Sequence, residues 1–323
     1  MLKALKELPK TLDETYDRIL LRIPEEYHQD AEIVFCLLAF SPRPISLQEA
    51  AEAVAMDLKE MSFDHRDRLQ EPRHILKICS SLVTLSPFEP KIWEWQTVSL
   101  ATADETKELR FAHYSVKEYL VSQRRSSHSF KIHSENAHQI ITKLCLIYLL
   151  SFRGVLEGRE SFRLLPFYQY ASQHWHVHAK NIQLVNDVTT LNMISLLFDE
   201  AYESNLRNSL RVWNPDKHFQ EYTEKFDFAP RIYYASSLGL FELCKLLLVA
   251  GADVNAHGGR FGNALQAAPV DGHREVVQQL LTAGADVNAQ GGLYGNALQA
   301  ASLEGHREVV QQQLLTAGAD STP

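Results

Sequence analysis

Residues 251–320 repeat short segments at a spacing of 33 residues, and this period limits the fold more than any other feature of the chain. Three pairs of segments share the spacing: GADVNA at 251–256 and 284–289, GNALQAA at 262–268 and 295–301, and GHREVVQQ at 272–279 and 305–312. GAD returns at 318–320, which is 34 residues after its previous copy. A chain with such a period folds as stacked copies of one small unit.

Each unit is predicted to contain two helices. The first covers about 264–270 and ends at Gly272, where a positive φ favours glycine. The second covers about 274–282 and ends at Gly284, which fits the left-handed position that follows a helix. The apolar residues of the second helix fall on one face. Because neither helix can bury its apolar face alone, the units must stack.

The period, GADVNA and GHREVV closely resemble the ankyrin repeat. We therefore expect a C-terminal ankyrin-repeat solenoid at 226–323. Its repeats are predicted at about 226–258, 259–291 and 292–323, the first being degenerate. The Thr-Pro-Leu-His opening that is usual in the family reads Asn-Ala-Leu-Gln here. Asn263 and Asn296 can cap the first helices, but the Thr–His bracing of the family is absent.

The resemblance implies a partner-binding face, because hairpin tips and first helices line one concave side of an ankyrin stack. Equivalent positions there differ between two repeats that are otherwise nearly identical. The candidate partner-binding residues are four such pairs: Arg260 and Leu293, Phe261 and Tyr294, Val270 and Leu303, Asp271 and Glu304. We expect Phe261 and Tyr294 to be exposed aromatic anchors, with packing between neighbouring hairpins as the alternative.

The third repeat has one residue too many. REVVQQLL at 274–281 becomes REVVQQQLL at 307–315, and one added residue turns the rest of a helix by about 100°. We expect this last helix to be bulged near Gln311–Gln313 or frayed, and to be the least stable part of the stack.

The first 125 residues are predicted to form helices followed by a β-hairpin. Capping-box patterns begin at Thr11, Ser46 and Ser115. Helices are expected at about 12–23, 24–40, 46–56 and 73–81, strands at 82–86 and 109–113, and a further helix after Ser115. Three helices followed by strand, wing and strand is the topology of a winged helix.

Three segments of this region resemble fungal NACHT proteins, which are NLR-like (STAND) signalling ATPases that often end in ankyrin repeats. They are LPKTLDETYDRILLRIPEEY at 8–27, ILKICSSLVTLS at 75–86 and LRFAHYSVKEYL at 109–120. Residues 126–225 resemble the helical linker of that family more loosely. The resemblance implies domains at 1–125, 126–225 and 226–323, and a regulatory role beside an ATPase.

That ATPase needs the phosphate-binding motif G-x-x-x-x-G-K-[ST], which does not occur in this sequence. We interpret the chain as a fragment, a truncated product or a relative that has lost this domain. A NACHT ATPase, in the same chain or a separate one, is then a partner. We accordingly expect no cofactor.

No enzyme is predicted. His174 and His178 have the spacing of a helical zinc pair, but no third ligand is apparent, so we predict no metal site and a structural helix instead. Asp253, Asn255 and their copies 33 residues later are interpreted as turn formers. No G-x-S-x-G is present, and no catalytic residue is proposed.

Charge distribution separates the remaining functions. The net charge is −8, divided as −4 at 1–125, zero at 126–225 and −4 at 226–323. This distribution disfavours nucleic-acid and membrane binding, and Glu49 and Glu52 on the third helix disfavour DNA further. Four scattered cysteines and the absence of a signal core or a long apolar run favour a cytoplasmic location.

The sequence thus predicts a mostly α-helical protein that binds protein partners through its ankyrin surface and regulates signalling. A winged-helix regulator that binds nucleic acid is the alternative.

Overall fold

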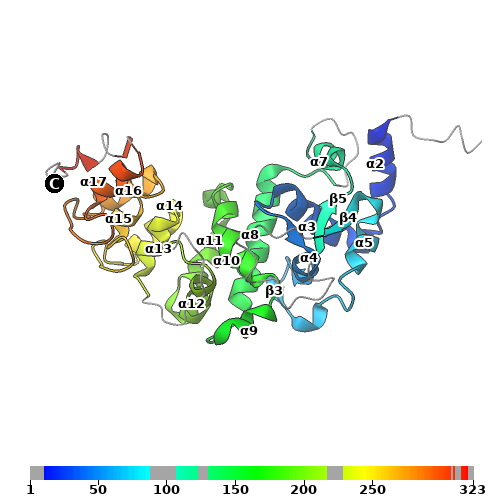
Figure 1. The fold of residues 1–323 in the computed structure, drawn as a ribbon, viewed down its shortest axis with the longest axis horizontal. Coiled ribbons are helices and arrows are strands. Elements are labelled where there is room, and N and C mark those ends of the chain that lie inside the picture. Colours follow the sequence, from blue (N-terminus) through cyan, green and yellow to red (C-terminus); the bar gives the residue numbers. More distant parts are fainter. Residues whose placement is uncertain are drawn as a thin grey trace, which may run out of the picture. The chain divides into compact units, whose positions relative to one another are not determined.

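The computed structural model describes residues 11–87, 107–122, 130–216, 228–306, 308–309 and 314–318. The chain forms two compact units, one of residues 1–151 and 163–182 and the other of residues 152–162 and 183–323. Both are built mainly from helices, and the short strands of the described residues all belong to the first unit (Figure 1). The mostly helical fold is therefore confirmed. The helices of 126–225 contribute to both units, and the division into three domains stays a prediction.

The first unit contains an antiparallel sheet in the order β1–β5–β4. β4 (Val83–Pro87) pairs with β5 (Lys107–Phe111), and β1 (Ile45–Ser46) pairs with the other edge of β5. The two longer strands lie within two residues of their predicted positions. The predicted wing at 88–106 lies outside the described residues. A second small sheet, which the sequence did not suggest, pairs β2 (Met56–Asp57) with β3 (Ser62–Phe63).

The helices of the first unit surround one apolar core. They are α2 (Leu12–Leu20), α3 (His28–Phe40), α4 (Leu47–Val54), α5 (His74–Ile78), α7 (Tyr114–Val121), α8 (Ser134–Ser151) and α10 (Tyr168–Ala179). α8 packs against both α3 and α10, and most of its residues from Ile141 to Leu149 are buried. α3 is also apolar on nearly every side, because it lies between α8, α4 and β5. α9 (Gly158–Arg163) follows the end of α8.

Two of the three predicted helix caps are present. Thr11 accepts the amide of Glu14, and Ser46 forms a full capping box with Glu49. The prediction for Ser115 is wrong, because α7 begins two residues earlier than expected and His113 is its cap. The Ser115 hydroxyl lies 2.7 Å from the Tyr16 hydroxyl and thus joins α7 to α2.

Two glutamates that we counted as surface charges are buried in α4. Glu49 forms an ion pair with Arg43, with 2.5 Å between Oε1 and Nη2. Glu52 forms an ion pair with Arg68 and accepts a hydrogen bond of 2.6 Å from Tyr148 of α8. Neither carboxylate therefore faces outward, so the expectation that these two charges would repel DNA is wrong.

A chain of buried polar groups crosses the first unit from α3 to α10. The Tyr170 hydroxyl lies 2.8 Å from the Ser41 hydroxyl and 2.9 Å from Nε2 of His178. Nδ1 of His178 lies 2.8 Å from Nδ1 of His138 on α8. Burial lowers the pKa of His178 to about 3 and the pKa of His174 to about 4. Both imidazoles are therefore neutral in the folded chain at neutral pH.

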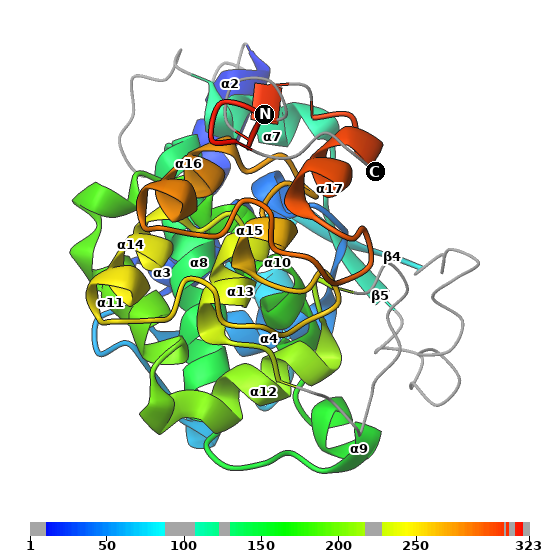
Figure 2. The same ribbon diagram turned by 90° about the vertical axis from the view of Figure 1, so that its left-hand side faces the viewer.

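The second unit contains the repeats and the helices before them. Its helices are α11 (Val188–Leu197), α12 (Glu203–Val212), α13 (Arg231–Ser237), α14 (Phe241–Val249), α15 (Ala264–Ala267), α16 (Arg274–Thr282) and α17 (Ala297–Leu303). They form two rows, α11–α14–α16 and α13–α15–α17, in which each helix contacts the next (Figure 2). We call the first of these the outer row. This layout is the predicted stack of helix pairs.

Two further findings concern the chain as a whole. All four cysteines are buried, and none forms a disulfide, as expected. Among the helices in the described ranges, none combines the length and the apolar character needed to span a bilayer.

The buried imidazoles predict that the first unit loses stability in acid. An unfolded histidine binds a proton near pH 6.5, whereas folded His178 does so only near pH 3, so unfolding takes up a proton between these values. At pH 5 the His178 contribution to this loss is about 2 kcal/mol. Replacing it, His178→Gln, should make the fall in unfolding free energy from pH 7.5 to 5.0 smaller by that amount, measured through Trp175 fluorescence.

Asp30 provides a control of opposite sign. Burial raises its pKa to about 6, so the folded state binds the extra proton and acid stabilises it. The change Asp30→Asn should therefore make the loss at pH 5 larger. Equal pH dependence in the wild type and the His178 variant would contradict this account.

Candidate protein-binding surface

The first helices of the second and third repeats begin as the sequence predicts. The side chain of Asn263 accepts the Gln266 amide at 2.9 Å, and that of Asn296 accepts the Gln299 amide at 2.8 Å. Each cap fixes the point where the hairpin becomes a helix, and so fixes where the hairpin side chains point.

The bracing that the missing Thr–His pair would supply comes from Gln266. Its Nε2 donates to the carbonyls of Ala289, Gly291 and Gly295 at 3.0–3.2 Å. One side-chain amide therefore ties the segment 289–295, which joins the second repeat to the third, to the first helix of the second repeat. The recurrence of Gln at 266 and 299 is the feature of the sequence that points to a role for this side chain in the repeats.

Backbone contacts join the two hairpins directly. The Leu293 amide donates to the Arg260 carbonyl at 3.0 Å. The close approach requires a glycine next to it, because a Cβ on Gly292 would lie 2.0 Å from the Phe261 carbonyl oxygen. The φ of Gly292, +65°, also disfavours other residues.

The turns that follow the second helices are linked in the same way. Asn255 accepts the Asp286 amide at 2.8 Å and donates to the Gly284 carbonyl at 3.2 Å. Asn288 repeats the second contact with Gly318. The predicted turns are present, since Asp253 and Asp286 accept the amides of Asn255 and Asn288, and the two asparagine side chains in addition bind the next repeat. The first helices are linked by His306, whose Nε2 lies 2.9 Å from the Val270 carbonyl.

A buried carboxylate outside the repeats holds the first of these hairpins. Oδ2 of Asp216 accepts the Arg260 amide at 3.0 Å, and Oδ1 accepts the Tyr233 hydroxyl at 2.5 Å. The same hydroxyl accepts the Phe261 amide at 3.2 Å. Burial raises the pKa of Asp216, and these donors partly offset the effect. No repeat signal marks Asp216, so sequence reasoning could not find it.

The two aromatic candidates pack on one another. The rings of Phe261 and Tyr294 are parallel to within 5°, with centroids 5.7 Å apart. Phe261 is only 4% exposed, so the expectation that it is an exposed anchor is wrong and the packing alternative holds for it. Val270 is buried as well. The Phe261 amide and the Val270 carbonyl form hydrogen bonds that hold the repeats together. Contacts with a partner must therefore come from other residues.

The remaining candidates lie on the surface. Leu303 is 71% exposed and Leu293 is 50% exposed, whereas Tyr294 is half-buried. The Tyr294 hydroxyl donates to Glu304 at 2.6 Å, and this bond raises the pKa of Tyr294. Arg260 and Asp271 are exposed and close enough to act on the same hydroxyl. We call Arg260, Asp271, Leu293, Tyr294, Leu303 and Glu304 the hairpin surface.

The added residue of the third repeat falls in a segment that is described only at its two ends. Val309 and Leu314 both have π-helical backbone and are both buried, although Gln311–Gln313 lie outside the described residues. Val276 and Leu280, four residues apart in α16, are buried in the same way. Val309 and Leu314 are thus both buried although they are five residues apart, as a bulge between them requires. The bulge predicted near Gln311–Gln313 itself lies outside the described residues and stays a prediction.

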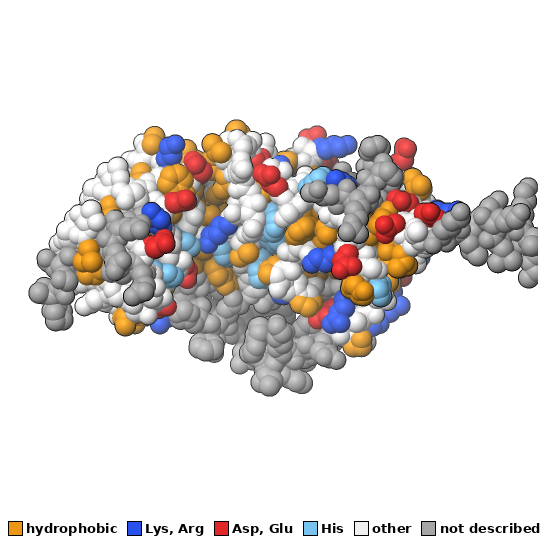
Figure 3. Space-filling model, turned by 90° about the horizontal axis from the view of Figure 1, so that it is seen from above, with side chains coloured by type: hydrophobic (Ala, Val, Ile, Leu, Met, Phe, Trp, Pro, Cys, Tyr) orange, Lys and Arg blue, Asp and Glu red, His pale blue; other side chains and the backbone are white. Residues whose placement is uncertain are grey.

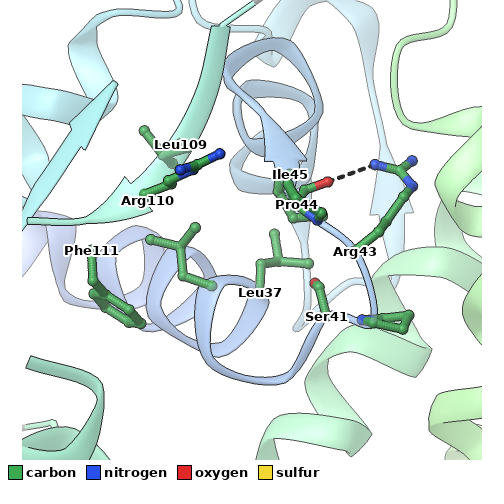
Figure 4. A pocket seen from close by; sticks show the side chains of 10 residues that line it. Leu37, Ser41, Arg43, Pro44, Ile45, Leu109, Arg110 and Phe111 are labelled. Carbon is green, nitrogen blue, oxygen red and sulfur yellow. Dashed lines mark hydrogen bonds between the residues drawn. The ribbon is translucent and has the colours of Figure 1, made fainter. Parts of the chain in front are cut away.

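The first unit offers a shallow cleft of about 290 Å³ beside α3 and β5 (Figure 4). Arg43 and Arg110 lie on opposite sides of it, and both are already engaged. Arg43 donates to the Pro44 carbonyl and pairs with Glu49, while Arg110 pairs with Glu108 at 2.5 Å. The cleft therefore has no charge left for an anionic ligand at these two positions.

Metal binding finds no support at the His174–His178 pair. Both ring nitrogens of His178 are engaged by His138 and Tyr170. Within the described ranges, no three His, Cys, Asp or Glu side chains come together in a group that could hold a metal ion.

With this geometry in place, comparisons with known proteins identify the C-terminal region. Residues 232–322 match the family model of ankyrin repeats, with three copies. Over 295 residues the chain is also 38% identical to "Azaphilone pigments biosynthesis cluster protein L" of Monascus ruber. The alignment covers 85% of this chain and 59% of that relative, so the chain spans well under two thirds of the relative's length.

The contrast between buried Phe261 and exposed Leu303 predicts opposite effects of truncation. The change Phe261→Ala removes half of the ring stack and should lower the unfolding free energy by about 3–5 kcal/mol. The matched change Leu303→Ala should alter it by less than about 0.5 kcal/mol. Urea unfolding followed by circular dichroism measures both. A small effect of the Phe261 change would show that the hairpins do not depend on the stack.

The added residue predicts that the third repeat becomes more stable when one residue is removed. Deleting Gln312 should restore the α-helical spacing of Val309 and Leu314. The expected gain is on the order of 1 kcal/mol, or a rise in Tm of about 2–4 °C, with slower amide exchange around Glu308 and Leu314. A lower Tm would show that the surrounding structure is fitted to the added residue.

Proposed function

We propose that the chain is a non-catalytic protein-interaction and regulatory module, and that the hairpin surface of its ankyrin repeats binds the partner. The observation that carries the proposal is an exposed set of side chains on a hairpin whose backbone is fixed by its neighbours. A rigid scaffold of this kind lowers the entropic cost of binding. Two exposed leucines beside a tyrosine supply the apolar contact, and Glu304 and Arg260 supply the polar rim.

We further propose that the first unit is a winged helix of the type found beside NACHT ATPases. Apart from the small β2–β3 sheet between α4 and α5, its order of elements, α3–β1–α4–α5–β4–β5, and its strand order β1–β5–β4 agree with that topology. The sequence segments around residues 8–27 and 109–120 support the same proposal. Its role would then be to restrain an ATPase, in the same chain or a separate one, until the repeats bind their partner.

The name of the Monascus relative refers to a pigment biosynthesis cluster. We propose that the partner of the hairpin surface acts in biosynthesis of that kind. The identity of the partner protein follows from capture experiments rather than from this similarity.

DNA binding by the winged helix is the second candidate, and it rests on the strand order alone. The described face in Figure 3 shows Lys and Arg interspersed with Asp and Glu instead of gathered in one patch. α5 provides Lys77 but is only five residues long. A gel shift with generic duplex DNA at low salt separates the two candidates, and we expect no shift.

The hairpin surface predicts which substitution abolishes partner capture. The change Leu303→Glu puts a charge into the exposed apolar contact and should reduce capture of the partner from a cell extract by about tenfold or more. The control Gln278→Glu puts the same charge on an exposed position of α16 and should leave capture unchanged. Both variants should keep the wild-type Tm.

Quantitative mass spectrometry of the captured proteins gives the measurement. Equal capture by both variants would contradict the assignment of the partner to the hairpin surface.

A further inference from the structure

A groove of about 330 Å³ lies between the second and third repeats, at the turns that join the first helix of each repeat to its second. A Cβ on Gly305 would meet no atom within 4 Å, so the groove is open on that side. On the other side Gly272 lies against the His306 ring, where a Cβ would come within 2.6 Å of Nδ1. The lining consists of these turns and the helix starts that follow them: Gly272, Arg274, Gly305, His306, Glu308 and Val309.

The His306 ring gives the groove a hydrogen-bond acceptor. Its Nε2 lies 2.9 Å from the Val270 carbonyl, which can only accept, so Nε2 carries the proton. In the neutral ring Nδ1 is then an acceptor, and it is the atom nearest to the place of a Cβ on Gly272. A ligand group that enters beside Gly272 therefore meets an acceptor.

Two carboxylates stand at the rim of the groove. Asp271 and Glu304 directly precede the two glycines of the lining, and both are exposed. Both also act on one hydroxyl. The hydrogen bond from Tyr294 to Glu304 raises the pKa of Tyr294, and the charge of Asp271 adds to this effect. The two carboxylates therefore lie near one another, and we call them the rim carboxylates.

Cations near the groove offset this charge only in part. Arg274 is already paired with Glu308, with 3.3 Å between Nη1 and Oε2. Nη1 of Arg260 donates to the Asp216 carbonyl at 2.8 Å. Nε2 of His273 lies 4.0 Å from one rim carboxylate, but it donates to a main-chain carbonyl of the first repeat at 3.0 Å. Over the described part of this face, the groove therefore has a net negative charge.

The repeat fold does not require acid at this place. The residue 33 positions before Asp271 is Leu238, which is only 5% exposed. The same turn therefore accepts a buried leucine in one repeat and an exposed carboxylate in the next two. Charge of one sign on a binding face favours a partner of the opposite sign.

We propose that this groove receives a lysine or arginine side chain of the protein partner, and that an apolar residue next to it on the partner contacts Leu303. Leu303 is 71% exposed and directly precedes Glu304, so the apolar contact and the charge lie side by side. An ammonium or guanidinium group has donors and no acceptor, which suits both the rim carboxylates and Nδ1 of His306. Its aliphatic stem can pass over the two glycines. This assignment rests on the proposed function, because the rim carboxylates belong to the hairpin surface.

Peptide selection tests the occupant before the partner is known. A phage library of random peptides is selected at low salt on the immobilised full chain, and the enriched peptides are synthesised and titrated by fluorescence anisotropy. Their sequences should carry Lys or Arg directly beside Leu, Ile, Met or Phe. The double variant Asp271→Asn with Glu304→Gln should bind them about tenfold more weakly than the wild type or worse, because the cation loses two charged acceptors.

A change in the peptide shows whether the two charges meet. Replacing the peptide's cation by Gln should weaken binding to the wild type about tenfold, but binding to the double variant by about twofold or less. The control Glu275→Gln removes an exposed carboxylate one repeat before Glu308 and should bind like the wild type. The variants should keep the wild-type Tm, because the amide of the Glu304→Gln variant still accepts the Tyr294 hydroxyl.

The change Leu303→Ala separates this proposal from the function on which it rests. It should weaken binding of the enriched peptides about fivefold. Full binding by the double variant, with a loss in Leu303→Ala, would overturn the cationic occupant and keep the hairpin surface. Full binding by both would contradict the hairpin surface as well. A selection that enriches no peptide, or only peptides without Lys or Arg, would also overturn the proposal.

Discussion

Every element of the second unit depends on the fact that a single repeat cannot bury its own apolar face. A helix pair of this size exposes Val276, Val277 and Leu280 unless a neighbour covers them. The structure meets this need with side chains that bind the backbone of the next repeat, chiefly Gln266, Asn255 and His306. Because each bond satisfies a backbone group that would otherwise lose its partner, removal of one partner costs more than the bond contributes.

The need of each repeat to bury its apolar face against a neighbour also determines which side chains stay exposed and can bind a partner. Positions that face a neighbouring repeat are nearly identical in the second and third repeats, and the stack buries them. Phe261 is buried although this position differs between the two repeats, because Tyr294 covers it. Leu293, Leu303 and Glu304 are exposed, and the difference between repeats at these positions is what marks the hairpin surface.

The sequence predicts local features better than contacts between distant segments. The ankyrin period and the Asn263 and Asn296 caps were predictable, because each follows from residues close together in the chain. β1 was not predictable, since two residues carry no period, and it exists only because β5 lies beside them. The burial of Phe261 and the role of Asp216 depend on partners 33 and 44 residues away. Ser115 shows that even a capping pattern gives way when a tertiary partner, here Tyr16, takes the hydroxyl.

The central claim is that a protein partner contacts the hairpin of the third repeat. Hydrogen exchange of the chain, alone and with its captured partner, measures this most directly. The account predicts slower exchange of the amides from 291 to 304 in the complex, with unchanged exchange in α16. Protection confined to the first unit, with no change at 291–304, would contradict it.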